Sequence, residues 1–174
     1  MTSPSGRIAF IGGGNMASAI IGGLVRQGLS PNHIAVVEPF AEARERLAEA
    51  FGVIAEPTPG LALQGAGVVV WAVKPQTFRD AAAQARPHLD GAIHLSVAAG
   101  IRSDSIAAWT GSERIVRAMP NTPALVGRGM TGLYARDAVN AADRAQVETV
   151  LATTGRLLWV AEERHLDAVT ALSG

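Results

Sequence analysis

A cluster of glycines near the start of the chain has the spacing of a phosphate-binding turn. It fits the pattern G-x-G-x-x-A, follows the apolar run at 7–12 and opens a helical pattern. The first glycine allows a tight turn, the second lets a pyrophosphate approach the backbone, and the small last residue lets the helix pack closely on the strand. Free N–H groups at the helix N-terminus would then bind the phosphate. A dinucleotide site is therefore predicted, the alternative being a tight turn without ligand. The residues are Gly12, Gly13, Gly14, Asn15, Met16 and Ala17.

A carboxylate follows the second predicted strand, where such sites bind the adenine ribose. Glu38 lies 24 residues after Gly14, near the usual spacing of about 20. A carboxylate there accepts hydrogen bonds from the ribose hydroxyls, which favours NAD, and repels the 2′-phosphate of NADP. Arg44 and Arg46 in the next helix could offset that repulsion, so the cofactor is NADP or NAD. The alternative for Glu38 is an exposed glutamate at a strand end.

Three further peptides follow predicted strands and belong to the same edge of the sheet, because ligands collect beyond the carboxyl ends of parallel strands. Lys74, the only lysine, lies in the first peptide, small residues make up the second, and two prolines rigidify the third. The alternatives are a surface lysine, a plain loop and a rigid turn. The residues are Ala72, Val73, Lys74 and Pro75; Ala98, Ala99 and Gly100; and, within the segment 119–123, Asn121 and Thr122.

No group of side chains points to acid–base, nucleophilic or metal catalysis. The chain has no cysteine, and its four histidines lack a metal-ligand spacing. His94 is expected to be a buried, hydrogen-bonded core residue, and Glu162 and Glu163 a solvated helix start. Catalytic residues therefore stay unknown, and no metal is predicted.

Strands and helices alternate along the whole chain with short connections. This order predicts an α/β fold of Rossmann type, a doubly wound, mostly parallel sheet with helices on both faces. Ser103 is expected to be the N-cap of its helix. The expected strands span 7–12, 33–38, 53–55, 68–73, 92–97, 115–119, 130–134 and 157–160, and the expected helices 15–27, 42–51, 77–86, 103–109, 141–153 and 163–172.

Composition excludes several classes of partner. Among 174 residues, 15 basic and 15 acidic side chains cancel, which argues against binding to nucleic acid or to anionic membranes. No apolar run reaches the roughly 18 residues of a membrane span, and residues 1–7 lack the features of a signal peptide. We therefore expect a cytoplasmic protein with a small-molecule partner.

The four motifs, taken in order, resemble those of pyrroline-5-carboxylate reductases, and the segment Met-Pro-Asn-Thr-Pro-Ala at 119–124 is the most specific. The resemblance covers essentially the whole chain. It implies hydride transfer from NADPH or NADH to the imine of 1-pyrroline-5-carboxylate, giving L-proline in the last step of proline biosynthesis. It also implies that the first three motifs bind the dinucleotide and that Asn121 and Thr122 face the nicotinamide and substrate.

The sequence departs from this family in three places. Glu38 stands where many members carry a small hydroxyl or basic residue, and Pro59 where many carry asparagine. The family also continues into a helical substrate and dimerisation domain. We therefore expect residues 1–162 to be the NAD(P)-binding domain and 163–174 to begin the connection. Such a fragment would bind dinucleotide with little turnover and be monomeric or weakly associated, whereas the full-length form would be a homo-oligomer.

Two other functions share the glycine turn. One is a reductase of the 3-hydroxyacid or prephenate dehydrogenase type, which is not expected to carry the 119–123 peptide. The other is a non-catalytic domain that senses a dinucleotide.

Overall fold

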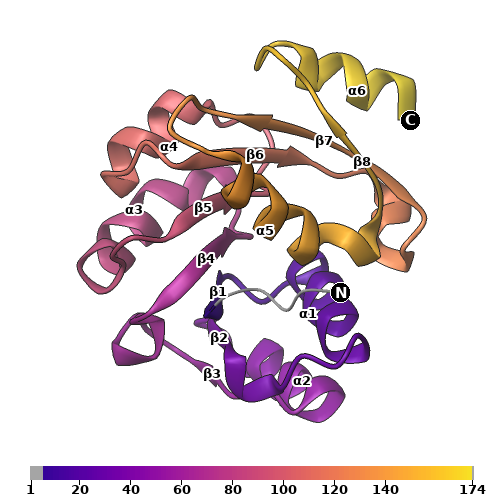
Figure 1. Cartoon of the computed structure of the whole chain (residues 1–174). Helices are drawn as coiled ribbons and strands as arrows, with labels where there is room; N and C mark the ends of the chain where they lie inside the picture. The colour runs from indigo at the N-terminus through magenta and orange to yellow at the C-terminus, as the bar shows by residue number, and fades with distance from the viewer. Residues whose placement is uncertain (1–5, 174) are drawn as a thin grey trace.

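The computed structural model describes residues 6–173, and they form one eight-stranded sheet with helices on both faces (Figure 1). The strand order is β3-β2-β1-β4-β5-β6-β7-β8. The strands are β1 (Arg7–Ile11), β2 (Ile34–Val37), β3 (Ala55–Glu56), β4 (Ala66–Trp71), β5 (Ile93–Ser96), β6 (Ile115–Met119), β7 (Gly129–Ala135) and β8 (Gly155–Trp159). The helices are α1 (Asn15–Arg26), α2 (Ala41–Phe51), α3 (Pro75–Ala85), α4 (Ser103–Thr110), α5 (Ala141–Leu151) and α6 (His165–Ser173).

The sheet is parallel from β3 to β6 and reverses once. β7 pairs antiparallel with β6, and β8 runs parallel to β7. The central strands are apolar on both faces, as expected for a parallel sheet covered on both sides. In β4, for example, Val68, Val69, Val70 and Trp71 are all buried. The Rossmann-type, mostly parallel fold class is confirmed.

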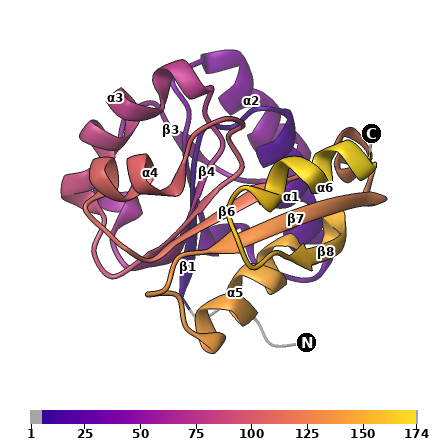
Figure 2. The ribbon, with the colours of Figure 1, turned by 90° about the horizontal axis from the view of Figure 1, so that it is seen from above.

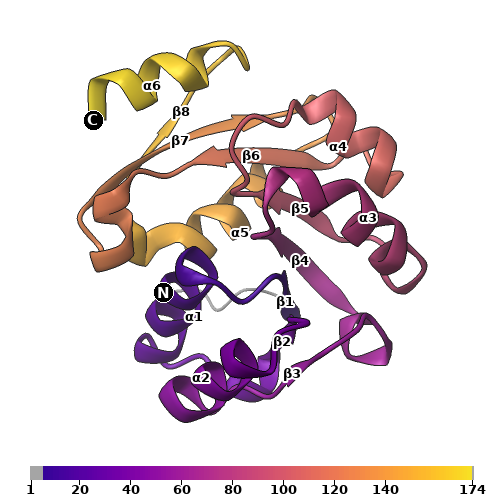
Figure 3. The same cartoon turned by 180° about the vertical axis from the view of Figure 1, so that it is seen from behind.

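Two apolar layers hold the helices to the sheet. Helices α1, α2 and α5 cover one face through a cluster that includes Ile20, Leu47 and Val147, and Figure 3 shows them across the sheet from α3 and α4. Helices α3 and α4 cover the other face through Phe78 and Ile106, and Figure 2 shows them side by side. Helix α6 packs on β7, where a Cβ on Gly132 would lie 3.1 Å from Cγ1 of Val169.

His94 is the buried histidine that the sequence predicts. Its Nδ1 accepts a hydrogen bond of 3.1 Å from Nε1–H of Trp71. Burial, helped by the positive charge of Arg114, lowers the pKa of His94 to about 4. The imidazole is therefore neutral at physiological pH and serves the core. No helix among the described residues is long and apolar enough to cross a bilayer.

The expected position of the N-cap of α4 is wrong. Arg102 is the N-cap, and Ser103 is the first helical residue. Its hydroxyl donates a hydrogen bond of 2.6 Å to Oε1 of Glu163, a residue 60 positions away. A long-range acceptor has therefore overridden the local preference of serine for the N-cap position. Helix α3 also begins earlier than expected, at Pro75, since proline suits the first turn of a helix.

Candidate dinucleotide-binding site

The loops that follow β1, β2, β4 and β5 are tied together at one edge of the sheet. The N–H of Gly12 donates to the carbonyl oxygen of Val37 (2.8 Å), and the N–H of Ala72 donates to that of Ile11 (2.8 Å). The N–H of Val97 donates to the carbonyl oxygen of Trp71 (3.1 Å). The peptides that the sequence singles out after these strands therefore lie along the same edge, where an open parallel sheet binds its ligands.

The three glycines of the turn differ in what the fold demands of them. Gly12 has φ +98°, and a Cβ there would overlap the Ala72 carbonyl, 2.8 Å from its carbon. A Cβ on Gly13 would lie 2.9 Å from Cδ1 of Leu47. Gly14 has φ −77°, and a Cβ there would meet no atom within 4 Å. Nothing in the described chain demands glycine at position 14, which suits a site where an outside group approaches the backbone.

Helix α1 begins at this turn with a terminus suited to an anion. Gly14 is its N-cap and provides no side-chain cap, and its first turn carries no acidic residue. The first N–H groups of a helix have no partner within the helix, and the helix dipole adds a partial positive charge. Among the motif residues, Gly14 and Asn15 are exposed, Met16 is half-buried and Ala17 is buried against the core. These residues fit a pyrophosphate.

Glu38 lies under the glycine turn. It is only 7% exposed, so the alternative of an exposed strand-end glutamate is wrong. Its Oε1 accepts from the N–H of Gly13 (3.1 Å), and its Oε2 accepts from the N–H of Phe40 (2.9 Å). Nη1 of Arg44 donates to the carbonyl oxygens of Glu38 (2.9 Å) and Pro39 (2.8 Å). Arg44 therefore lies at the end of β2, whereas Arg46 is exposed on α2 without a bond to this turn.

The peptides after β4 and β5 form the next part of the edge. Ala72 and Val73 are half-buried, whereas Lys74 is exposed as the N-cap of α3, directly before Pro75. After β5, the small residues expose backbone to the same edge: Ala98 is buried, while Ala99 and Gly100 are exposed.

The segment after β6 lies against α1. Thr122–Val126 forms a short 3-10 helix, η4, which packs on α1. Asn121 is its N-cap, and Oδ1 of Asn121 accepts from the N–H of Met130 (3.1 Å). Thr122 is exposed. The fold thus brings this segment to the helix that begins at the glycine turn.

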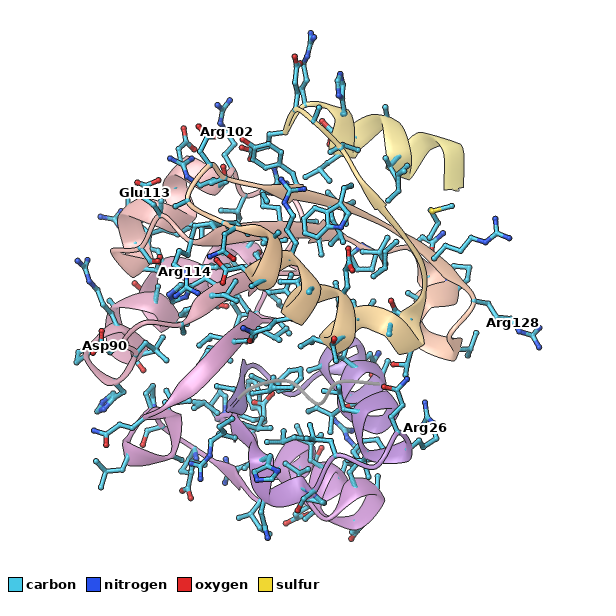
Figure 4. All side chains as sticks on the ribbon, in the orientation of Figure 1. Arg26, Asp90, Arg102, Glu113, Arg114 and Arg128 are labelled. Carbon is cyan, nitrogen blue, oxygen red and sulfur yellow. The ribbon has the colours of Figure 1, made fainter. Side chains whose placement is uncertain are left out.

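A cluster of charged side chains between α4 and α6 was not predicted from the sequence. Oε2 of Glu163 accepts from Nη1 of Arg117 (2.7 Å) and from the N–H of Ser103 (2.7 Å). Arg136 donates to the Ser103 hydroxyl (3.1 Å) and pairs with Glu113, which Figure 4 labels beside α4. We call these five residues the Glu163 cluster.

The Glu163 cluster corrects the expectation that Glu163 is solvated. The side chain of Glu163 is 21% exposed, and that of Arg117 is 8% exposed. Burial alone would raise the pKa of Glu163, but the bonds from Ser103 and Arg117 outweigh it and hold that pKa below its usual range. No local signal could have found this cluster, because its partners lie 46 and 60 residues apart in the chain.

Within residues 6–173, no group of three or more histidine, aspartate or glutamate side chains could hold a metal ion. Backbone N–H groups, small residues and amides line the edge instead. Such an edge can bind and orient a dinucleotide, and the fold and the glycine turn together define a dinucleotide-binding domain of Rossmann type.

Comparison with known proteins specifies the family. The family model described as NADP oxidoreductase coenzyme F420-dependent matches residues 7–100, and the chain belongs to this family. The chain is 43% identical to the pyrroline-5-carboxylate reductase of Pseudomonas aeruginosa over 176 residues, which cover 100% of this chain and 64% of that protein.

Solved structures agree with this result. The pyrroline-5-carboxylate reductase of Coxiella burnetii superposes with a TM-score of 0.91 at 35% identity, covering 98% of this chain and 64% of that one. The Plasmodium falciparum pyrroline carboxylate reductase, solved with NADP bound, has a TM-score of 0.83 at 24% identity, covering 99% and 64%, and supports the fold. The chain thus spans less than two thirds of the length of these relatives.

Proposed function

We propose that this chain is the cofactor-binding part of a pyrroline-5-carboxylate reductase, which reduces the imine of 1-pyrroline-5-carboxylate to L-proline with NAD(P)H. The observation that carries the proposal is the Gly14 turn, an open approach to an uncapped helix N-terminus. The similarity to reductases of this name over the whole chain supports the substrate. The sequence of the segment 119–124, which the hydroxyacid and prephenate types are not expected to carry, favours this reductase over them.

The described residues act in this reaction by positioning. A reduced nicotinamide, when bound, supplies the hydride. The backbone N–H groups at the start of α1 hold the pyrophosphate. The small residues Ala98 to Gly100 leave room for a flat ring. By resemblance to the family we expect Asn121, whose Oδ1 accepts from the N–H of Met130, to face the nicotinamide and substrate. A protonated imine is already electrophilic, so orientation supplies much of the rate acceleration.

The site accepts NADPH as well as NADH. The description of the family includes NADP, and the guanidinium of Arg44 lies at the end of β2, where a nearby arginine accommodates a 2′-phosphate. The substrate is a small molecule, and we expect a full-length reductase of this kind to be a homo-oligomer.

Cofactor binding is tested by titrating the chain with NADPH and NADH. Both should bind, and Gly14→Val should abolish binding while the midpoint of urea unfolding stays near that of the parent chain. Ala141→Val, at the exposed first position of α5, is the matched control and should leave binding unchanged. Failure of the parent chain to bind either dinucleotide would contradict the proposal.

The reaction is tested by joining this chain to the remaining part of the Pseudomonas aeruginosa reductase. The chimera should oxidise NADPH only when 1-pyrroline-5-carboxylate is present and should release proline. A folded chimera that binds NADPH without turnover would favour the alternative of a dinucleotide-sensing domain.

A further inference from the structure

Glu38 contacts the glycine turn in a way that differs from a ribose-binding carboxylate. Each carboxylate oxygen already accepts a backbone N–H, Oε1 from Gly13 and Oε2 from Phe40. The residue is only 7% exposed. Little of its surface is therefore available to the hydroxyls of a ribose.

Neighbouring residues hold Glu38 in place. A Cβ on Gly13 would lie 3.4 Å from Cβ and Cγ of Glu38 and 2.9 Å from Cδ1 of Leu47, so the turn rests directly on these two side chains. Arg44 also donates to the carbonyl oxygens of Glu38 and Pro39 and fixes the turn into α2. Glu38 thus joins two loops that flank the same edge of the sheet.

We propose that Glu38 is a positioning residue that holds the phosphate-binding turn through the Gly13 N–H, and that it does not discriminate NADH from NADPH. This inference rests on the proposed dinucleotide site. Because the Gly13 N–H is bonded to the Glu38 carboxylate, Gly14 and the first N–H groups of α1 keep the orientation that a pyrophosphate needs. The negative charge of Glu38 is stabilised by two N–H groups instead of facing the 2′ position.

The test is the variant Glu38→Gln, titrated with NADH, NADPH and ADP. An amide has one acceptor oxygen, so one of the two N–H bonds must be lost. We expect all three affinities to fall by a similar factor, about tenfold, as for one charge-assisted hydrogen bond. Glu45→Gln, at an exposed position on α2, removes the same charge and should change none of them.

If Glu38 instead bound the ribose hydroxyls, the titrations would give a different result. Glu38→Gln would then lose NADH affinity while gaining NADPH affinity, and a change in the ratio of more than about threefold would overturn the proposal. Affinities equal to those of the parent chain in both Glu38→Gln and Glu38→Asp would overturn it too. Glu38→Asp keeps the charge but is too short to reach Gly13, so it should weaken all three ligands like the glutamine variant.

Hydrogen exchange of the parent chain tests the contact without any substitution. The amide of Gly13 should exchange at least tenfold more slowly than that of Gly14, because only the former is bonded to a buried carboxylate. Equal exchange rates would overturn the proposal. If the parent chain bound none of the three ligands, the proposed function would fail, and the Gly13 amide would still decide whether Glu38 holds the turn.

Discussion

The glycine turn and the Glu163 cluster lie against the same sheet but consist of different chemical groups. The turn consists of backbone groups and small residues, and the nearby carboxylate of Glu38 accepts hydrogen bonds from the N–H groups of Gly13 and Phe40. The cluster consists of charged side chains that pair with one another across α4, β6 and the approach to α6. The turn leaves N–H groups at the start of α1 for a ligand, whereas the cluster uses its polar groups internally. We infer that, in this domain, the residues that bind the ligand differ from those that stabilise the fold.

The largest effect should come from Gly12→Ala. Positive φ and overlap with the Ala72 carbonyl should together lower the free energy of unfolding by about 4 kcal/mol. Gly14→Ala, with φ −77° and open space, should lower it by less than about 1 kcal/mol. Urea unfolding of both variants measures the difference. If both variants lost similar amounts of unfolding free energy, Gly12 could not be assigned to folding and Gly14 to ligand binding.

The pH dependence of stability should reveal His94, which lies in β5 between the two regions. Its pKa of about 4 in the folded chain is below the unfolded value near 6.5, so the unfolded chain binds the proton first as pH falls. Stability should therefore drop by about 3 kcal/mol between pH 7 and pH 4. His94→Gln keeps an acceptor for Trp71 and should flatten this part of the curve. An unchanged slope would contradict the assignment.

A smaller loss is expected from Glu163→Ala, which leaves the guanidinium of Arg117 buried without its carboxylate. We expect about 2 kcal/mol, below the 3–5 kcal/mol of fully buried pairs, because Glu163 is 21% exposed. Since the pKa of Glu163 is lowered on folding, this contribution exists above the unfolded pKa and disappears as pH falls through the folded value. Exposed Glu162→Ala is the control. A loss of NADH affinity in Glu163→Ala would show that the two regions are coupled.

The smallest effect should come from Arg102→Ala. Arg102 and Asp104 form a pair of 3.5 Å, but their side chains are 77% and 60% exposed, and such pairs contribute less than about 0.5 kcal/mol. Urea unfolding at low and high salt measures it. A loss above about 1 kcal/mol would mean that charges stabilise α4 even where water reaches them.

The regions also differ in how far sequence alone can predict them. The turn is a local pattern, so Gly12 to Ala17 and its place after β1 follow from spacing and steric requirements. Glu163, Ser103 and Arg117 meet only after folding, and Ser103 left its preferred N-cap role for that reason. Glu38 is intermediate: its position at the end of β2 was predictable, but its burial depends on Leu47 and the packing of α2.

The different reasons for Gly12, Gly13 and Gly14 have an evolutionary consequence. Selection for folding alone preserves the first, whose φ and contact with Ala72 exclude a side chain. The second is preserved as long as α2 packs beneath it. The third is under selection only while a ligand uses the turn. A descendant of this domain that no longer binds a dinucleotide would therefore keep Gly12 and Gly13 but accept other residues at position 14. A substitution at position 14 in a related domain with the same fold would then indicate that dinucleotide binding has been lost.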